Sequence, residues 1–193
     1  MDTTKPKILI IIASTREGRR GEGIAKWAFG EAEKREDLDF ELVDLKKWNL
    51  PFFVSKVEPG DADYKPEGIV AKWSEKIASA DGFIIVTPEY NHGYPATIKN
   101  ALDHLYHEWV KKPIAFVSYG GGAGGARAVE QLRQVVIDFE MMPIPAAVHI
   151  VGVKKATDEE GAPNEERYAK SLASLFKNLS WWANVLQDAR IKL

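Results

Sequence analysis

The chain has 193 residues, of which 45% are hydrophobic, and this is enough to bury the core of one domain; we expect a single domain over residues 1–193. Its formal net charge of -2 argues against a general electrostatic grip on nucleic acid, which needs a basic footprint. The chain contains no cysteine, so disulfides, thiolate catalysis and cysteine-ligated metals are excluded, and any redox chemistry must use a bound cofactor.

The N-terminal segment has the charges but not the following apolar stretch of a secretory signal. The longest apolar run, Ile8 to Ala13, is far too short to span a bilayer. We therefore expect a cytoplasmic protein with no membrane partner.

Short apolar runs alternate with longer amphipathic segments, which indicates an α/β protein with a parallel sheet covered by helices on both faces. The predicted strands are Lys7–Ala13, Phe40–Asp44, Gly82–Thr87, Ile114–Tyr119 and Ala147–Val151. Helices are predicted over Gly23–Arg35, Gly68–Ala80, Pro95–Glu108, Gly125–Glu140 and Asn164–Ala189, each with apolar residues at helical spacing. Phe53–Glu67 and Lys154–Pro163 are predicted surface loops.

Five strands and five helices in alternation match, in number, the flavodoxin-like strand order 2-1-3-4-5. In such sheets a ligand binds beyond the carboxyl ends of the strands, near the point where the strand order reverses. The loops after strands one, three and four are therefore the candidate binding loops.

The first of these loops, Ser14 to Gly23, brings hydroxyls, arginines and glycines to the start of a helix. Backbone N–H groups at a helix N-terminus and arginine side chains suit a phosphate monoester. The alternative is that Ser14 or Thr15 caps the turn and the arginines are solvated.

The third loop, Pro88 to Pro95, follows an uncharged strand and carries two prolines, an amide, a carboxylate and two tyrosines. A flavin ring needs such a site, with donors and acceptors at its pyrimidine edge and apolar cover over its face. A proline-rich turn whose Asn91 and Gly93 serve local geometry is the alternative.

Several segments together resemble the NADPH-dependent FMN reductase family, flavodoxin-like enzymes that include quinone, chromate and azo-dye reductases. The strongest is TPEYNHGYPATIKNALDHL at Thr87–Leu105. STREGRRG at Ser14–Gly21 is similar to the family's phosphate loop, EWVKKP at Glu108–Pro113 to its lead into strand four, and SYGGGAGGARA at Ser118–Ala128 to its third flavin-side loop. The segments stand in the family's order over most of residues 7–135.

The resemblance implies a site for FMN. Residues at the phosphate would be Ser14, Arg16, Arg19 and Gly21; residues along the ring would be Pro88, Glu89, Tyr90 and Asn91, with Ser118 and Gly120 on the far side. The chain departs from many relatives at Ala13, where they have glycine, and from some at Arg19 and Gly21, where they have serine and asparagine.

The resemblance also implies a reaction. NADPH or NADH would pass a hydride to FMN and leave, so that a quinone-like, azo or other small acceptor takes its place, with no side-chain acid, base or nucleophile. Relatives form dimers or tetramers, so a homodimer or homotetramer is implied. An FMN-binding electron carrier or regulatory module without nicotinamide turnover is the rival, and a flavin-free scaffold is a third interpretation.

Three further patterns receive plainer interpretations. Gly120 to Gly125 satisfies GxGxxG but follows the fourth strand, so we interpret it as a loop beside the flavin and not as a dinucleotide fingerprint. His104 and His107 lack metal-site spacing, so we expect no metal and a helix-surface or interface role. Trp181 and Trp182 are expected in the core.

Overall fold

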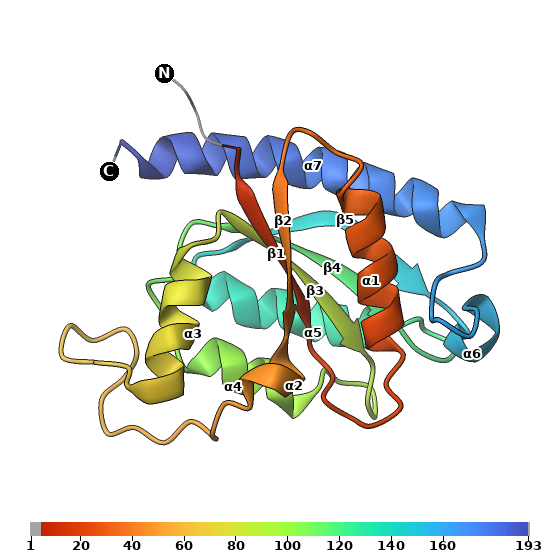
Figure 1. The fold of residues 1–193 in the computed structure, drawn as a ribbon. Coiled ribbons are helices and arrows are strands. Elements are labelled where there is room, and N and C mark those ends of the chain that lie inside the picture. The colour runs from red at the N-terminus through yellow and green to blue at the C-terminus, as the bar shows by residue number, and fades with distance from the viewer. Residues whose placement is uncertain (1–4, 193) are drawn as a thin grey trace.

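The computed structural model describes residues 5–192 and shows a parallel sheet between two layers of helices (Figure 1). Its five strands are β1 (Lys7–Ile12), β2 (Asp39–Asp44), β3 (Gly82–Pro88), β4 (Pro113–Tyr119) and β5 (Met142–Ile150). All neighbouring pairs are parallel, and the order is β2-β1-β3-β4-β5. The predicted flavodoxin-like α/β fold is confirmed.

The helices divide between the two faces of the sheet. One face is covered by α1 (Gly21–Ala32) and the long α7 (Glu166–Arg190), the other by α3 (Gly68–Ala78), α4 (Ala96–Asp103) and α5 (Ala126–Asp138) (Figure 1). Two short helices, α2 (Leu45–Trp48) and α6 (Val153–Ala156), follow β2 and β5.

The strand β1, which lies between β2 and β3, supplies both cores because alternate side chains of a strand point to opposite faces. Ile8, Ile10 and Ile12 pack under α1 and α7, whereas Leu9 and Ile11 pack under α3 and α4, and all five are buried. A strand buried on both faces reads as a continuous apolar run, which explains why the sequence predicted it well.

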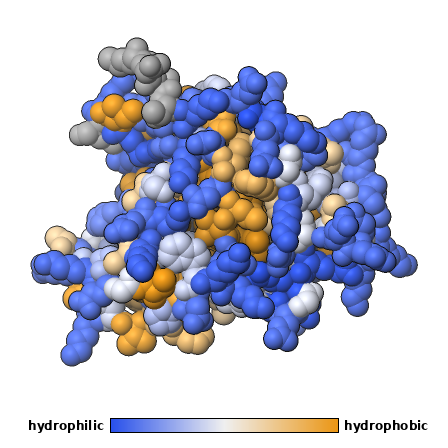
Figure 2. Space-filling model, viewed as in Figure 1, coloured by the Kyte–Doolittle hydropathy of each residue, from blue (hydrophilic) through white to orange (hydrophobic). Residues whose placement is uncertain are grey.

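The edge strand β2 is less enclosed. Its Phe40 and Leu42 are only partly buried while packing against the α1/α7 core. Figure 2 shows an apolar area over this strand, framed by polar side chains.

Element boundaries differ from the predictions where prolines or short helices intervene. The strand β5 begins at Met142, five residues before the predicted start, because its two prolines are tolerated on an edge strand. The helix α4 ends at Asp103, short of the predicted Glu108. Part of the predicted loop Lys154–Pro163 belongs to α6.

Two side-chain expectations were wrong. His104 is buried, with its Nε2 atom 2.8 Å from the carbonyl oxygen of Pro51, because the chain after α2 folds back over the end of α4. Trp181 is 59% exposed, whereas Trp182 is partly buried against the α1/α7 core. Consecutive residues of a helix point about 100° apart, so the core takes one of two adjacent tryptophans and not both.

Within residues 5–192, no helix is long and apolar enough to cross a membrane.

At the other end of the sheet from the candidate loops, Lys112 is buried where α3 ends. Its ammonium group donates to the carbonyl oxygens of Ile77 and Ala78, at 2.9 and 3.2 Å. Burial lowers the pKa of Lys112 to about 8, and the nearby charge of Arg190 acts in the same direction.

This pKa predicts that Lys112 makes stability depend on alkaline pH. Between about pH 8 and 10.5 the folded protein releases a proton that the unfolded chain still holds, so stability rises with pH in that window. In urea denaturation, the free energy of unfolding of the wild type relative to Lys112→Met should grow by on the order of 2 kcal/mol from about pH 7.5 to about pH 10.5. A constant or shrinking difference would contradict the lowered pKa.

Candidate functional site

The loops after β1, β3 and β4 meet at the carboxyl edge of the sheet, around a cavity of about 180 Å³. The cavity lies where the chain order reverses, since β1 pairs with β2 on one side and β3 on the other. It is lined by Arg16, Arg19, Arg20, Pro88, Glu89, Tyr90, Tyr119, Gly120, Gly121, Val153 and Lys154. Four segments that are far apart in the sequence, the three loops and the start of α6, thus form one surface.

The structure brings most of the predicted site residues to this cavity. Those that line it are Arg16, Arg19, Pro88, Glu89, Tyr90 and Gly120. Ser14 and Gly21 are buried in the first loop and the first turn of α1, and do not line the cavity. Asn91 is at the tip of the third loop, and Ser118 is buried within β4.

Arg19 of the first loop is held by an ion pair with Asp44 at the end of β2. Its guanidinium group donates to both carboxylate oxygens of Asp44, at 2.7 and 2.5 Å, and to the carbonyl oxygen of Ser14 at 2.6 Å. Its side chain is only 6% exposed. Burial acts to raise the pKa of Asp44, but the hydrogen bonds from Arg19 and from the Lys46 amide outweigh it and lower that pKa. Arg19 therefore fastens the first loop to the end of β2.

Other cations surround the cavity. Arg16 is exposed at its edge, and Lys154 reaches it from α6. Arg20 donates to the hydroxyl of Thr157 at 2.9 Å. The helix α1 begins without a side-chain cap, so its first N–H groups are available to an anion. The sequence prediction missed Arg20, although it belongs to the same arginine-rich loop, and missed Lys154, for which no local signal existed.

A cluster of hydroxyl groups lies beneath the first loop. Ser14 Oγ is 2.6 Å from Tyr90 Oη. Tyr119 Oη is buried against Gly21, where an added Cβ atom would lie 2.5 Å from it. Burial raises the pKa of Tyr119; the Ser14 hydroxyl and the Gly21 amide oppose that rise but do not reach hydrogen-bond geometry. Within residues 5–192 the phenol oxygen has no hydrogen-bond partner.

The third loop is a tight two-residue turn. Tyr90 and Gly93 exchange backbone hydrogen bonds of 2.8 and 3.0 Å, and Asn91 and His92 between them have φ angles of 49° and 69°. Two left-handed residues in succession are the mark of a type I′ turn. Gln131 of α5 also donates to the carbonyl oxygen of His92. The turn is thereby held rigid at the cavity.

The predicted ring-side residues Glu89 and Ser118 make contacts within the protein. The Glu89 carboxylate accepts from the side chain of Arg127 at 2.6 Å and from its backbone N–H at 3.2 Å, which joins the third loop to the start of α5. Ser118 donates to the carbonyl oxygen of Gly124 at 2.8 Å and lies 2.7 Å from His149 Nδ1. Both residues position the loops that carry the cavity walls.

The glycine-rich segment after β4 has a packing reason. Gly124 and Gly125 have φ angles of 60° and 86°, and a Cβ atom on Gly125 would lie 2.7 Å from the Cβ atom of Ser118. A left-handed turn pressed against a buried strand requires glycine there.

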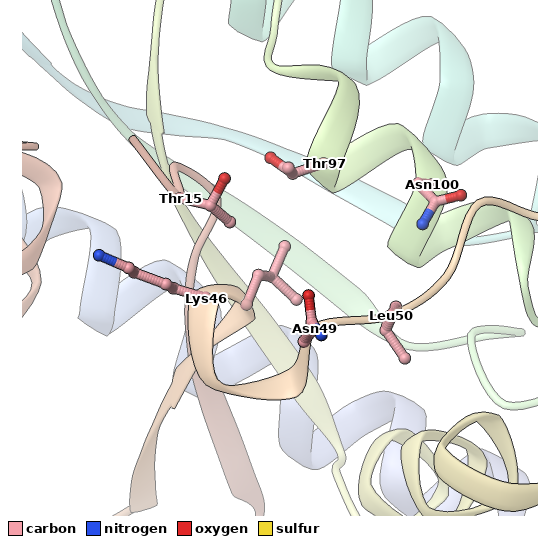
Figure 3. Close-up of a pocket in the computed structure, with 7 residues that line it drawn as sticks. Thr15, Lys46, Asn49, Leu50, Thr97 and Asn100 are labelled. Carbon is pink, nitrogen blue, oxygen red and sulfur yellow. The ribbon is translucent and has the colours of Figure 1, made fainter. Parts of the chain in front are cut away.

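A second cavity, also of about 180 Å³, lies on the other side of the first loop (Figure 3). It is lined by Thr15, Leu45, Lys46, Asn49, Leu50, Thr97 and Asn100. The amide of Asn100 is engaged with Pro51 and Phe53, and Thr97 donates to the carbonyl oxygen of Ala13. These contacts tie α4 to Ala13, which directly precedes the first loop, and to the segment after α2.

The residues of the first cavity fit a phosphorylated flavin. Arginines and free helix N–H groups suit a phosphate, glycine backbone allows close approach, and Pro88 and Tyr90 offer apolar cover. The buried phenol oxygen of Tyr119 is a further polar group without a partner in residues 5–192. By contrast, no group of three potential metal-binding side chains occurs in the described part of the chain.

The fold and this cavity define a flavodoxin-like protein with an arginine-rich loop beside a tight turn at the switch point of the sheet. Residues 6–155 match the family model described as NADPH-dependent FMN reductase, and the chain belongs to that family.

Similar proteins agree with this assignment. The chain is 49% identical over 145 residues to an NAD(P)H-dependent FMN reductase of Schizosaccharomyces pombe, covering 72% of this chain and 70% of that protein. It is 32% identical over 139 residues to a probable NADPH:quinone oxidoreductase of Oryza sativa subsp. japonica, covering 70% and 68%. The fold is similar to that of FerB, a flavoenzyme NAD(P)H:(acceptor) oxidoreductase from Paracoccus denitrificans, with a TM-score of 0.73, 24% identity and 93% and 97% coverage.

Arg16 and Arg19 of the first loop should differ in their effect on stability. Arg19→Met leaves Asp44 almost buried without its partner and is expected to lower the free energy of unfolding by about 3 kcal/mol. The same change at exposed Arg16 should cost less than about 0.5 kcal/mol. Urea denaturation of the two variants measures both values, and equal losses would show that the Arg19–Asp44 pair does not brace the loop.

Proposed function

We propose that the chain is a single-domain FMN-dependent NAD(P)H oxidoreductase that reduces a quinone-like, azo or other small acceptor. The observation that carries this is the cavity itself, where a cationic phosphate loop and a rigid Pro88–Gly93 turn face each other at the carboxyl edge of the sheet. Family membership supplies the reaction class.

In this proposal the first loop holds the phosphate of FMN. The first N–H groups of α1 and the side chain of Arg16 provide the contacts, with Arg20 and Lys154 nearby. Arg19 contributes by fixing the loop, since its donors are already engaged with Asp44, Glu22 and Ser14. Ser14 and Gly21 form the base of this subsite.

The ring of FMN would lie along Pro88, Glu89, Tyr90 and Asn91, with Gly120 opposite and Ser118 fixing that loop. Bound FMN would supply the hydride-transfer chemistry between the nicotinamide and the acceptor. The protein's part is to orient the ring and to keep the turn rigid. We assign no catalytic acid, base or nucleophile.

The cavity of about 180 Å³ is smaller than the roughly 300–1,000 Å³ typical of cofactor-sized sites. A bound FMN molecule would therefore extend beyond this cavity. We propose that the enzyme is a homodimer or homotetramer in which a second chain helps to cover the flavin, and that it acts in the cytoplasm with NADPH or NADH as the electron donor.

Flavin titration and reduction test this function. The purified protein should bind FMN, and NADPH or NADH should bleach the yellow complex rapidly, with a quinone restoring the colour. A complex that neither nicotinamide bleaches would identify an electron carrier or regulatory module. If FMN changes neither flavin fluorescence nor thermal stability, flavin binding itself is disproved.

Arg16→Ala should weaken FMN binding because it removes a charge-assisted hydrogen bond to the phosphate. Such a bond contributes roughly 1.5–3 kcal/mol, so the dissociation constant should rise about 10- to 150-fold. Fluorescence titration measures it. Arg35→Ala, at the opposite end of α1 and paired with Asp37, is the matched control and should bind FMN as the wild type does. An unchanged FMN dissociation constant for Arg16→Ala would show that Arg16 does not contact the phosphate.

A further inference from the structure

Tyr119 is the one residue of the hydroxyl cluster that the proposed function leaves without a role. It is the last residue of β4, it is 6% exposed, and its side chain reaches under the first turn of α1. A glycine at position 21 is what allows this contact, since any Cβ there would collide with the phenol oxygen. The phenol group of Tyr119 therefore lies next to the proposed phosphate loop. Its buried oxygen has no hydrogen-bond partner in residues 5–192, which is unfavourable for stability.

The three hydroxyl groups of the cluster have one donor proton more than the hydrogen bonds that can form among them. Tyr119, Ser14 and Tyr90 each carry one hydroxyl proton, and a chain of three hydroxyls contains two links. Only the link between Ser14 and Tyr90, at 2.6 Å, is formed in the structure. A cluster with a surplus donor is completed by a ligand that only accepts hydrogen bonds, and a phosphate oxygen is such an acceptor.

Tyr90 also covers Ser14. Ser14 is fully buried, whereas Tyr90 is 38% exposed and lines the cavity. For the Ser14 hydroxyl to reach a ligand, Tyr90 must give up its hydrogen bond and move aside. The Ser14 oxygen can then accept from another donor, and Tyr119 is the hydroxyl next to it.

We propose that Tyr119 is a positioning residue for the cofactor phosphate: the phosphate displaces Tyr90 from Ser14, the Ser14 O–H donates to a phosphate oxygen, and the Tyr119 O–H donates to Ser14 Oγ. The proposal rests on the proposed function, because it takes the phosphate to be that of FMN. It assigns opposite effects on phosphate binding to two tyrosines, Tyr90 and Tyr119. Tyr119 favours phosphate binding, and the Tyr90 hydroxyl competes with it.

Comparison of FMN with riboflavin tests the proposal, because riboflavin lacks the phosphate. Tyr119→Phe should raise the FMN dissociation constant about five- to tenfold and leave the riboflavin constant unchanged, as expected for loss of one supporting hydrogen bond. Without flavin, its thermal midpoint should be equal to or above that of the wild type, because an unpartnered buried oxygen is removed. Tyr90→Phe should bind FMN more tightly than the wild type, because it removes the competing hydroxyl. Tyr106→Phe, whose partly buried ring packs in the core on the α3/α4/α5 side of the sheet, is the matched control and should bind FMN as the wild type does.

A coupling measurement separates this role from packing. Because Tyr119 acts through Ser14, the loss of FMN affinity in Ser14→Ala should not increase when Tyr119→Phe is added. The proposal is overturned if Tyr119→Phe keeps the wild-type ratio of FMN to riboflavin affinity, or if it loses affinity for both flavins equally with a lower thermal midpoint. A wild-type protein that binds neither flavin would instead disprove the proposed function, whereas equal wild-type affinity for both flavins would disprove the phosphate role alone.

Discussion

The burial of β1 on both faces is the constraint on which the rest of the structure depends. Its side chains alternate between two cores, so helices cover the sheet on both sides. Its neighbours β2 and β3 lie on its two opposite edges, and the order of the chain therefore reverses at β1. The loop that leaves its carboxyl end enters a crevice and not a filled interior, which is why the arginine-rich loop and the Pro88–Gly93 turn face the same cavity.

The cavity is built by residues that look like ligand contacts but hold loops in place. Arg19 donates its hydrogen bonds to Asp44 and Ser14. Glu89 accepts hydrogen bonds from Arg127 at the start of α5, and Ser118 donates to the carbonyl oxygen of Gly124 in the glycine-rich turn. Each of these polar groups is satisfied within the protein before any ligand arrives. Because these hydrogen bonds form before a ligand binds, the site is rigid, and less conformational entropy is lost on binding.

The fold was largely predictable because its signals are local. The uncharged runs around Ile8–Ile12 and Gly82–Thr87 indicated buried parallel strands, and the resemblance at Thr87–Leu105 supplied the strand order that periodicity lacks. The misplacements came from long-range packing. Pro143 and Pro145 made the first residues of β5 unlike a strand in sequence, so its start was predicted too late. The exposure of Trp181 and the burial of His104 depend on which elements pack against them.

The sequence by itself determined the class of the protein and predicted the three loops that meet at the cavity, because residue type and spacing express helix starts, glycine turns and buried strands directly. Only the tertiary structure decided the role of each polar group. Whether Arg19 faces a phosphate or Asp44, and whether the phenol of Tyr119 finds a partner, depends on atoms that are 25 and more residues away. Hydrogen bonding and burial are properties of that packing, and no local pattern encodes them.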